Sequence, residues 1–135
     1  MKHKFIRIAK SLLHLLVALI VVAGCSGGGA EGVGVREVGA AEAVSVLSSR
    51  IVIDVRSPAE VAEGAVVGAT PLDFNAGEFQ EKIGDYDRNA AYLLYCRSGS
   101  RSGQAAAIMK DLGFTDVIDA GAFTDLVAAG ASTTP

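Results

Sequence analysis

Short apolar runs alternate along this chain with segments in which apolar residues recur every three or four positions. The runs predict strands at Val35–Val38, Ile51–Val55, Val66–Leu72, Ala91–Tyr95 and Val117–Asp119. Two of these runs are almost wholly apolar, which is typical of strands covered on both faces. The segments between the runs predict helices at Ala40–Ser49, Pro58 to near Gly64, Phe74–Ile83 and Gln104–Leu112. Strands that alternate with helices predict an α/β fold, with a central, mostly parallel sheet flanked by helices.

Two sites in the sequence define element boundaries more closely. Ser57 is predicted to be an N-cap, with Pro58 as the first helical residue and Glu60 as the acid of a capping box. Pro71 lacks a backbone N–H, so it indicates that its strand lies at an edge of the sheet or is ending there. The strand predicted at Ala91–Tyr95 is expected to be buried, and the next residue is a cysteine.

The loop Cys96–Arg101 holds the strongest chemical signal. Its sequence, CRSGSR, places a thiol where a buried strand ends and a helix follows. Ligand sites of open α/β sheets form at such strand ends, and helix N–H groups and cations favour an anion there. The pKa of Cys96 is therefore expected to lie below the usual value of about 8.5, which makes the residue a nucleophilic thiolate. A buried core cysteine is the simpler alternative, although arginine, serine and glycine are poor neighbours for an apolar interior.

The N-terminus predicts export. Four basic residues within the first ten precede the apolar run Leu12–Ala23, as in a secretory signal. The end of that run, Val22–Cys25, resembles a bacterial lipobox, which implies cleavage before Cys25 and a lipid on that residue. An uncleaved membrane anchor is the alternative. Both interpretations place the domain outside the cytoplasm, tethered to a membrane, and Ser26 favours the outer membrane where a cell has two.

This interpretation divides the chain into three parts. Residues 1–24 form the signal peptide, residues 25–34 form the lipidated cysteine with a glycine-rich tether, and residues 35–135 form one domain. The net charge of the whole chain is −3, and four of its 12 basic residues lie in the signal, so the remainder carries −7. That balance argues against nucleic acid as a partner.

Cysteine and histidine positions limit the chemistry further. An acylated Cys25 leaves Cys96 without an intrachain partner, so no disulfide framework is expected. His3 and His14 both lie in the signal, which excludes a Cys–His dyad in the processed protein. The sequence holds no Cys/His cluster for zinc, and neither a metal nor a cofactor is predicted.

Four segments resemble the rhodanese domain, in the same order and at suitable spacing: Ile53–Glu60, Gly64–Ala69, Cys96–Ser102 and Gly113–Val117. The resemblance implies a rhodanese-like three-layer α/β fold. It also implies sulfurtransferase activity, in which a donor such as thiosulfate gives a sulfane sulfur to a cysteine, and an acceptor such as cyanide or a thiol removes it.

The resemblance assigns roles to individual residues. Cys96 corresponds to the sulfur-carrying cysteine. The loop that cradles the persulfide corresponds to Arg97, Ser98, Gly99, Ser100 and Arg101. Asp54 and Arg56 correspond to a supporting pair at a strand end. The chain departs from the family at Ala65 and Val67, where His and Pro are common, and at Gly121–Phe123, where a Gly-Gly-Trp pattern is usual.

The loop residues suit an anionic donor. The guanidinium groups of Arg97 and Arg101 can offset the repulsion between a thiolate and the thiosulfate dianion. Ser98 and Ser100 can donate hydroxyl hydrogen bonds, and Gly99 allows the backbone to turn. Each residue also has a plainer interpretation: Arg101 can pair with an acid, Arg97 can point to solvent, and the serines can be ordinary turn residues.

Two other functions remain open at this point. Cysteine-dependent phosphatases and arsenate reductases use Cys-x5-Arg, whereas Arg101 gives Cys-x4-Arg here and Ser102 occupies the position that Arg would need. A sulfur carrier or a thiol-dependent docking module at the membrane would need the same pocket as a sulfurtransferase. Turnover distinguishes a carrier from an enzyme.

Overall fold

The computed structural model describes residues 34–135. The predicted signal peptide, Cys25 and nearly all of the predicted tether lie outside the described residues. Within the described part of the chain, no helix is long and apolar enough to cross a membrane.

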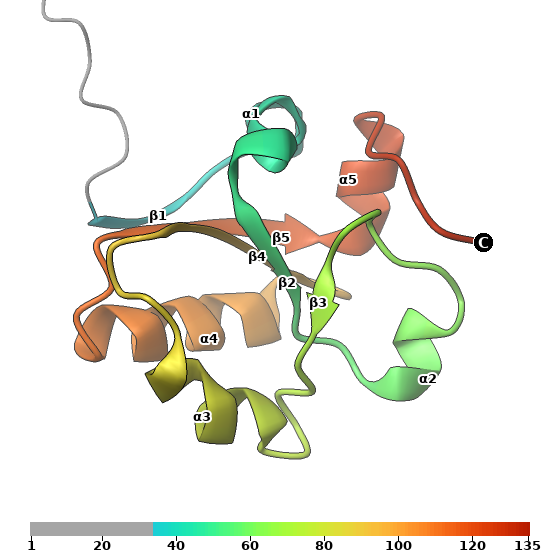
Figure 1. Cartoon of the computed structure of the whole chain (residues 1–135). Helices are drawn as coiled ribbons and strands as arrows, with labels where there is room; N and C mark the ends of the chain where they lie inside the picture. The colour runs from blue at the N-terminus through green and yellow to red at the C-terminus, as the bar shows by residue number, and fades with distance from the viewer. Residues whose placement is uncertain (1–33) are drawn as a thin grey trace, which may run out of the picture. The chain divides into compact units, whose positions relative to one another are not determined.

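The strands of the described part form one parallel sheet (Figure 1). Their bounds are β1 Gly34–Glu37, β2 Ile51–Asp54, β3 Thr70–Pro71, β4 Ala91–Cys96 and β5 Asp116–Ala122. The order across the sheet is β1-β5-β4-β2-β3, and every pair of neighbours is parallel. The α-helices are α1 Ala40–Val46, α2 Pro58–Val61, α3 Glu78–Lys82, α4 Ser100–Asp111 and α5 Phe123–Ala128, with 3₁₀ turns at Leu47–Ser49 and Ile83–Asp85. The predicted fold class is confirmed.

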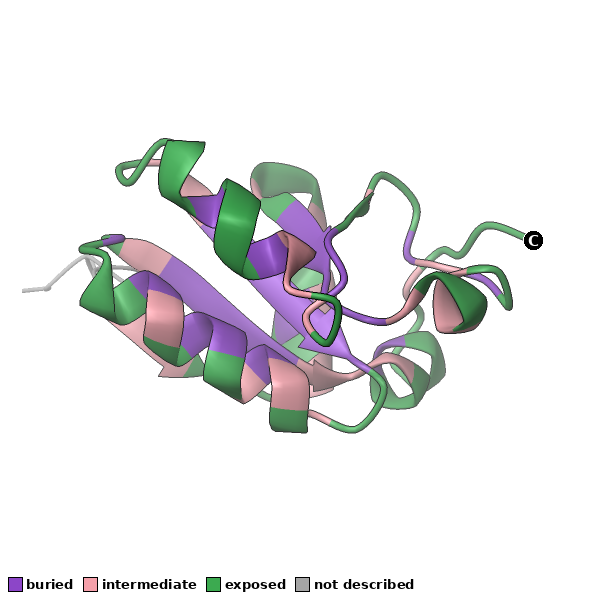
Figure 2. Cartoon of the chain, turned by 90° about the horizontal axis from the view of Figure 1, so that it is seen from below, coloured by how far each residue is buried: buried purple, intermediate pink, exposed green. Residues whose placement is uncertain are grey.

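Helices cover both faces of the sheet. Figure 1 shows α1 and α5 on one side and α3 and α4 on the other. Successive strand residues point to opposite faces, so Leu93 packs in the α1/α5 layer while Leu94 packs in the α3/α4 layer. Figure 2 shows the buried residues running along the strands and the inner sides of these helices. This two-sided cover explains why β2 and β4 read as continuous apolar runs.

The capping box that begins α2 is confirmed. The Ser57 N–H donates to Glu60 Oε2 at 2.9 Å, and the Glu60 N–H donates back to Ser57 Oγ at 3.4 Å. Pro58 is the first helical residue, and α2 ends at Val61. The reciprocal bonds fix the Glu60 carboxylate at the carboxyl edge of the sheet, just beyond β2.

The helix that follows Cys96 begins four residues earlier than predicted. The apolar spacing predicts a start at Gln104, whereas α4 begins at Ser100. Gly99 adopts φ +94° and turns the chain directly into the helix. The first turn of α4 is polar, so apolar periodicity could not reveal it. Arg101 and Ser102 consequently belong to a helix and not to a loop.

Two further predicted elements are shorter than expected. Of Val66–Leu72, only Thr70–Pro71 pairs with β2, because Gly68 turns the chain at φ +80°. Pro71 lies on an edge strand, as predicted. Of Phe74–Ile83, residues 74–77 are not helical, because the Asp73 carboxylate accepts the N–H groups of the two residues after Phe74 and holds a turn.

Candidate active site

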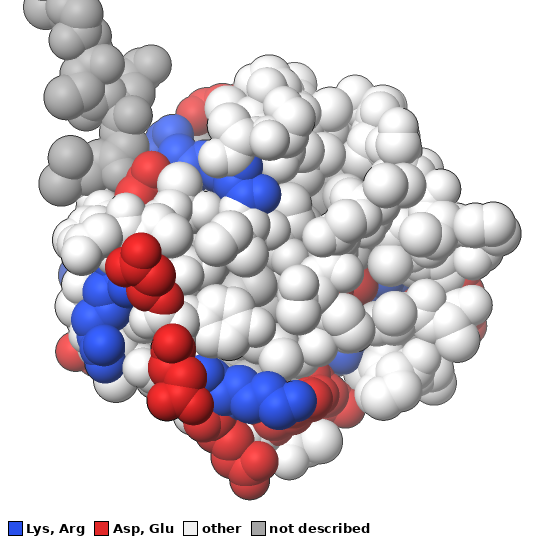
Figure 3. Space-filling model, in the orientation of Figure 1, with Lys and Arg blue, Asp and Glu red and all other residues white. Residues whose placement is uncertain are grey.

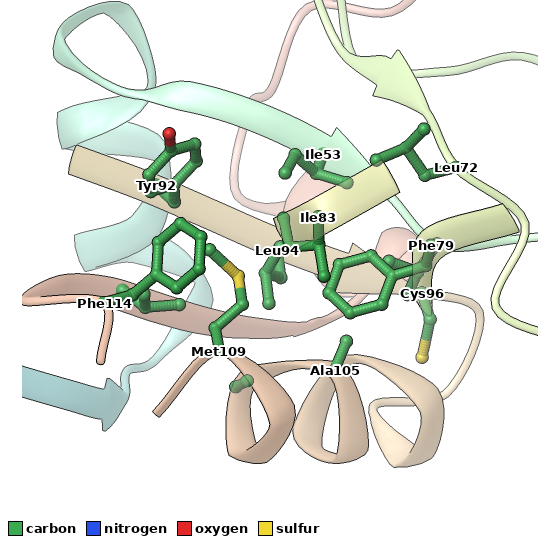
Figure 4. Packing of buried hydrophobic residues seen from close by; sticks show 13 residues of the cluster. Ile53, Leu72, Phe79, Ile83, Tyr92, Leu94, Cys96, Ala105, Met109 and Phe114 are labelled. Atoms are coloured by element: carbon green, nitrogen blue, oxygen red, sulfur yellow. The ribbon is translucent and has the colours of Figure 1, made fainter. Parts of the chain in front are cut away.

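Cys96 is the last residue of β4, and its side chain packs in the α3/α4 layer. Figure 4 shows it beside Phe79, with the sulfur directed toward α4. The residue is 0% exposed. Cys96 is therefore buried, as the alternative of a core cysteine predicted. Its sulfur nevertheless has polar groups around it as well as apolar side chains.

Backbone N–H groups meet the sulfur where α4 begins. The Gly99 N–H donates to Cys96 Sγ at 2.9 Å. Burial acts most strongly on this thiol and would raise its pKa. Hydrogen bonds from the N–H and hydroxyl of Ser102 and from the N–H groups of Ser98 and Gly99 outweigh burial and hold the pKa of Cys96 below its ordinary value. The sulfur thus lies in a cradle of N–H dipoles, as favours a thiolate.

Ser102 is a site residue that sequence reasoning missed. It is fully buried in the first turn of α4, where its hydroxyl lies 3.0 Å from the Gly99 carbonyl oxygen and can donate to it. The hydroxyl has one proton, and when that proton turns from the carbonyl to the Cys96 sulfur it lowers the pKa of the thiol. Because the helix was predicted to begin later, Ser102 was noted only as the end of the matched segment Cys96–Ser102 and as the residue at the position that would hold Arg in a longer loop.

The other loop residues divide into two groups. Arg97, Ser98 and Ser100 are exposed around the turn. Arg101 is not free in solvent but forms an ion pair with Glu60. Its Nη1 donates to Glu60 Oε2 at 2.7 Å and its Nη2 donates to Glu60 Oε1 at 2.8 Å. The plainer interpretation of Arg101, that it pairs with an acid, is the arrangement that the structure shows.

The acid of that pair, Glu60, was expected only to cap α2. The Arg101 hydrogen bond, aided by the Ser57 bonds and opposed by burial, lowers the pKa of Glu60 to about 2. Glu60 therefore stays ionised throughout the neutral range. The capping box accounted fully for an acid at this position, so nothing else in the sequence pointed to a second role.

Asp54 and Arg56 form a buried ion pair on the opposite face of the sheet from the Cys96 side chain. Arg56 Nη2 donates to Asp54 Oδ2 at 2.7 Å, and Arg56 Nε donates to Asp54 Oδ1 at 2.9 Å. Arg56 Nη2 also lies 2.7 Å from the Gly64 carbonyl oxygen. The pair does not approach the sulfur directly, because neighbouring strand residues face opposite ways. It supports the strand ends.

Tyr95 connects that pair to the residue beside it, Cys96. Its hydroxyl donates to Asp54 Oδ2 at 2.7 Å and accepts the Val66 N–H at 3.1 Å. Burial, followed by the bond to Asp54, raises the pKa of Tyr95 well above its usual value, so the hydroxyl keeps its proton. These bonds fix the backbone of β4 one residue before the thiol.

Phe123 fills the place where the sequence lacks the family's tryptophan pattern. The Arg56 guanidinium carbon lies 4.1 Å from the centroid of the Phe123 ring and 5.5 Å from that of Tyr95. The two rings stack at 5.8 Å. The aromatic residue at the start of α5 thus covers the buried cation, a cation–π contact that favours its burial. Within residues 34–135, no group of three or more His, Cys, Asp and Glu residues is placed to hold a metal ion.

The first prediction concerns the Tyr95 hydroxyl. Tyr95→Phe leaves the Val66 N–H buried without its acceptor and removes one donor from Asp54, so we expect a loss of about 1–2 kcal/mol in the free energy of unfolding. Urea denaturation followed by circular dichroism measures it. The control is Tyr86→Phe at a half-buried tyrosine, expected to stay within about 0.5 kcal/mol of wild type. Equal stability of Tyr95→Phe and wild type would remove the hydroxyl from the network.

The second prediction concerns the ionisation of Cys96. N–H and O–H donors favour the thiolate, so the pKa of Cys96 is lower in the folded protein than in the unfolded chain. Ionisation of Cys96 therefore stabilises the fold fully above the unfolded pKa. This contribution is lost as the pH falls through the folded pKa. Ser102→Ala removes one donor and should move the midpoint upward. Thiolate ultraviolet absorbance, taken as the difference from Cys96→Ala, measures it. Ser98→Ala keeps its N–H donor and should leave the midpoint unchanged, whereas equal midpoints for Ser102→Ala and wild type would contradict the assignment.

Comparison with known proteins agrees with this architecture. The rhodanese-like domain family matches residues 39–124. Thiosulfate sulfurtransferase PspE of Escherichia coli (strain K12) is 36% identical over 76 residues, which cover 55% of this chain and 71% of PspE. The tRNA sulfurtransferase of Haemophilus influenzae (strain PittEE) is 33% identical over 85 residues, but the match spans only 18% of that protein.

Solved structures give the same result. A rhodanese-related protein from Thermoplasma volcanium superposes with a TM-score of 0.66 at 25% identity, covering 73% of this chain and 97% of the other. A structure of an Escherichia coli rhodanese with anions superposes with a TM-score of 0.56 at 31% identity, covering 63% and 96%. Sequence motifs, sheet order and these matches agree, and the chain belongs to the rhodanese-like domain family, with sulfurtransferases among its named relatives.

Proposed function

We propose that this protein is a sulfurtransferase that carries a sulfane sulfur on Cys96. The observation that carries the proposal is the position of the sulfur: it ends a central strand, 2.9 Å from the Gly99 N–H, and has a lowered pKa. Relatives named as sulfurtransferases support the same class of reaction. Thiosulfate is the reference donor.

Two displacement steps describe the reaction. The Cys96 thiolate attacks the outer sulfur of thiosulfate; the Sγ–S bond forms, the donor S–S bond breaks, and sulfite leaves with the electron pair. Cyanide or a thiolate then attacks the outer sulfur of the persulfide and restores the Cys96 thiolate. Neither step needs a general base once Cys96 is a thiolate, the form that its hydrogen-bond donors favour. The N–H groups that hold the thiolate can hold the negative charge of the persulfide in turn.

The burial of the sulfur adds one requirement. Cys96 has no exposed surface, so the outer sulfur of a donor can reach it only when the loop or a neighbouring side chain moves aside. Exposed Arg97 and Ser98 border the turn on its solvent side. Once the sulfur is transferred, the same cover limits access of water to the persulfide.

The third prediction tests loading and turnover together. After thiosulfate treatment, intact mass should rise by about 32 Da, one sulfur on the nucleophile, and steady-state thiocyanate should form when cyanide is added. Cys96→Ala should lose both. Loading without turnover would identify a carrier instead of an enzyme, and Cys96-dependent hydrolysis of p-nitrophenyl phosphate without loading would favour a phosphatase.

We also propose that the protein is exported and anchored by a lipid on Cys25. The support is the order of basic residues, apolar run and lipobox-like Val22–Cys25 in the sequence. The acidic remainder of the chain would gain no attraction from anionic lipid, so acyl chains would supply the attachment.

The fourth prediction follows from this anchor. Cys25→Ser should release the protein from the membrane fraction or leave an unprocessed precursor, because the acylated side chain is lost. Cell fractionation with immunoblotting measures the distribution. Cys96→Ser removes the other cysteine of the chain and should fractionate as wild type. A Cys25→Ser protein that is processed and membrane-bound like wild type would contradict acylation.

A further inference from the structure

Glu60 holds two elements at once. Its Oε2 accepts from the Ser57 N–H and hydroxyl, both at 2.9 Å, and from Arg101 Nη1 at 2.7 Å. Its Oε1 accepts from Arg101 Nη2 at 2.8 Å. The carboxylate therefore joins the start of α2 to the first turn of α4, which supplies the Ser102 N–H to Cys96.

This arrangement changes the charge at the site. A guanidinium has five N–H donors, and two of those on Arg101 are committed to a carboxylate that stays ionised at neutral pH. The side chains of the pair are only 16% and 20% exposed, so water screens their interaction incompletely. The positive charge of Arg101 is matched by Glu60 before any donor arrives.

A second carboxylate adds to the effect. After Glu60, the charges of Cys96 and Asp73 also raise the pKa of Arg101, so both lie within its electrostatic reach. Asp73 is 9% exposed. Figure 3 shows acidic side chains over α3 with basic ones among them, and Glu78 of α3 pairs with Lys82 of the same helix. With Cys96 ionised, the negative charges around Arg101 outnumber its positive one, and the remaining cation of the loop, Arg97, is exposed to solvent.

We propose that Glu60 determines donor specificity: by neutralising Arg101 it makes the site accept sulfane donors with one negative charge in preference to the thiosulfate dianion. The donor class is therefore R–SO₂–S⁻ or R–S–S⁻, a terminal sulfur on a group that carries no second charge near it. This inference rests on the sulfurtransfer proposed for Cys96. In this proposal the N–H dipoles of the turn, and not an unpaired arginine, bind the incoming sulfur.

The step balances for such a donor. The Cys96 thiolate attacks the terminal sulfur of R–SO₂–S⁻, the Sγ–S bond forms, the bond between the two donor sulfurs breaks, and R–SO₂⁻ leaves with the electron pair. Two negative charges are present before and after. With thiosulfate there are three, and the dianion meets a thiolate while the charge of Arg101 is already matched by Glu60, which raises the cost of encounter in a partly desolvated site.

The fifth prediction compares two donors that differ by one charge. Methanethiosulfonate is a monoanion and thiosulfate a dianion, and both present a sulfane sulfur on an oxidised sulfur. The quantity measured is the donor ratio, kcat/KM for methanethiosulfonate divided by kcat/KM for thiosulfate, with cyanide as acceptor. Comparing this ratio between variants cancels the intrinsic reactivity of the donors. Glu60→Gln should lower it about fivefold, mainly through a lower KM for thiosulfate.

Matched variants separate charge from structure. Glu60→Asp keeps the charge, Ser57→Ala weakens the capping box but keeps the carboxylate, and Glu63→Gln neutralises an exposed acid nearby. Each should keep the donor ratio within about twofold of wild type. If Glu60→Gln lowers kcat/KM for both donors equally, Glu60 has only a structural role and the inference is wrong.

A measurement on the wild-type protein does not depend on any variant folding. Raising potassium chloride from about 20 to about 500 mM screens the repulsion of the dianion more than that of the monoanion, so the donor ratio should fall. A ratio that rises with salt would show net attraction of the dianion and overturn the inference. If neither donor gives thiocyanate and Cys96 gains no sulfur, the proposed sulfurtransfer itself fails. Activity with both donors but no change of ratio in Glu60→Gln refutes the specificity role alone.

Discussion

A buried sulfur can stay negatively charged only if enough hydrogen-bond donors point at it, and this constraint organises the carboxyl edge of the sheet. Desolvation opposes ionisation of Cys96, and the opposing groups are N–H and O–H donors of the turn and the first turn of α4. Those donors converge because Gly99 takes φ +94°, a backbone conformation that residues with a side chain rarely adopt. The convergence of the donors on the thiol therefore depends on this glycine.

The opposite face of the sheet also buries charge, and there the charged groups are an ion pair. A buried ion pair such as Asp54–Arg56 is costly unless its remaining donors and acceptors are satisfied. Here Tyr95, the Gly64 carbonyl and the Phe123 ring complete the set. Tyr95 and Cys96 are consecutive and face opposite layers. The hydrogen bonds of Tyr95 on one face of the sheet therefore fix the backbone from which the Cys96 thiol projects on the other face. The pair is thus a structural support for the site, with no contact to the reacting atom required.

Sequence reasoning predicted the sheet better than the polar turns. Apolar runs located β2 and β4, because strands buried on both faces need apolar residues at every position. The start of α4 was placed too late, since its first turn carries Arg101, Ser102 and Gly103 and has no apolar stripe to detect. The strand predicted at Val66–Leu72 shrank for a similar reason: a local turn at Gly68 overrides a favourable composition. Elements defined by burial were predictable, and so was the capping box of α2, which is a local motif of residue types. The first turn of α4, whose polar residues surround a thiol, was not.

Glu60 illustrates why a residue with a sufficient local explanation can conceal a second role. An acid at the third helical position completes a capping box and needs no partner elsewhere. Yet the geometry that lets its Oε2 accept from Ser57 also turns Oε1 toward α4, 41 residues later in sequence, where Arg101 meets both oxygens. Capping places the carboxylate, and the ion pair then sets the charge that an incoming donor encounters. Because N–H dipoles already favour the thiolate form of Cys96, the charge of Arg101 is not needed to ionise the thiol. The pairing of Arg101 therefore acts on the choice of donor more than on the nucleophile itself.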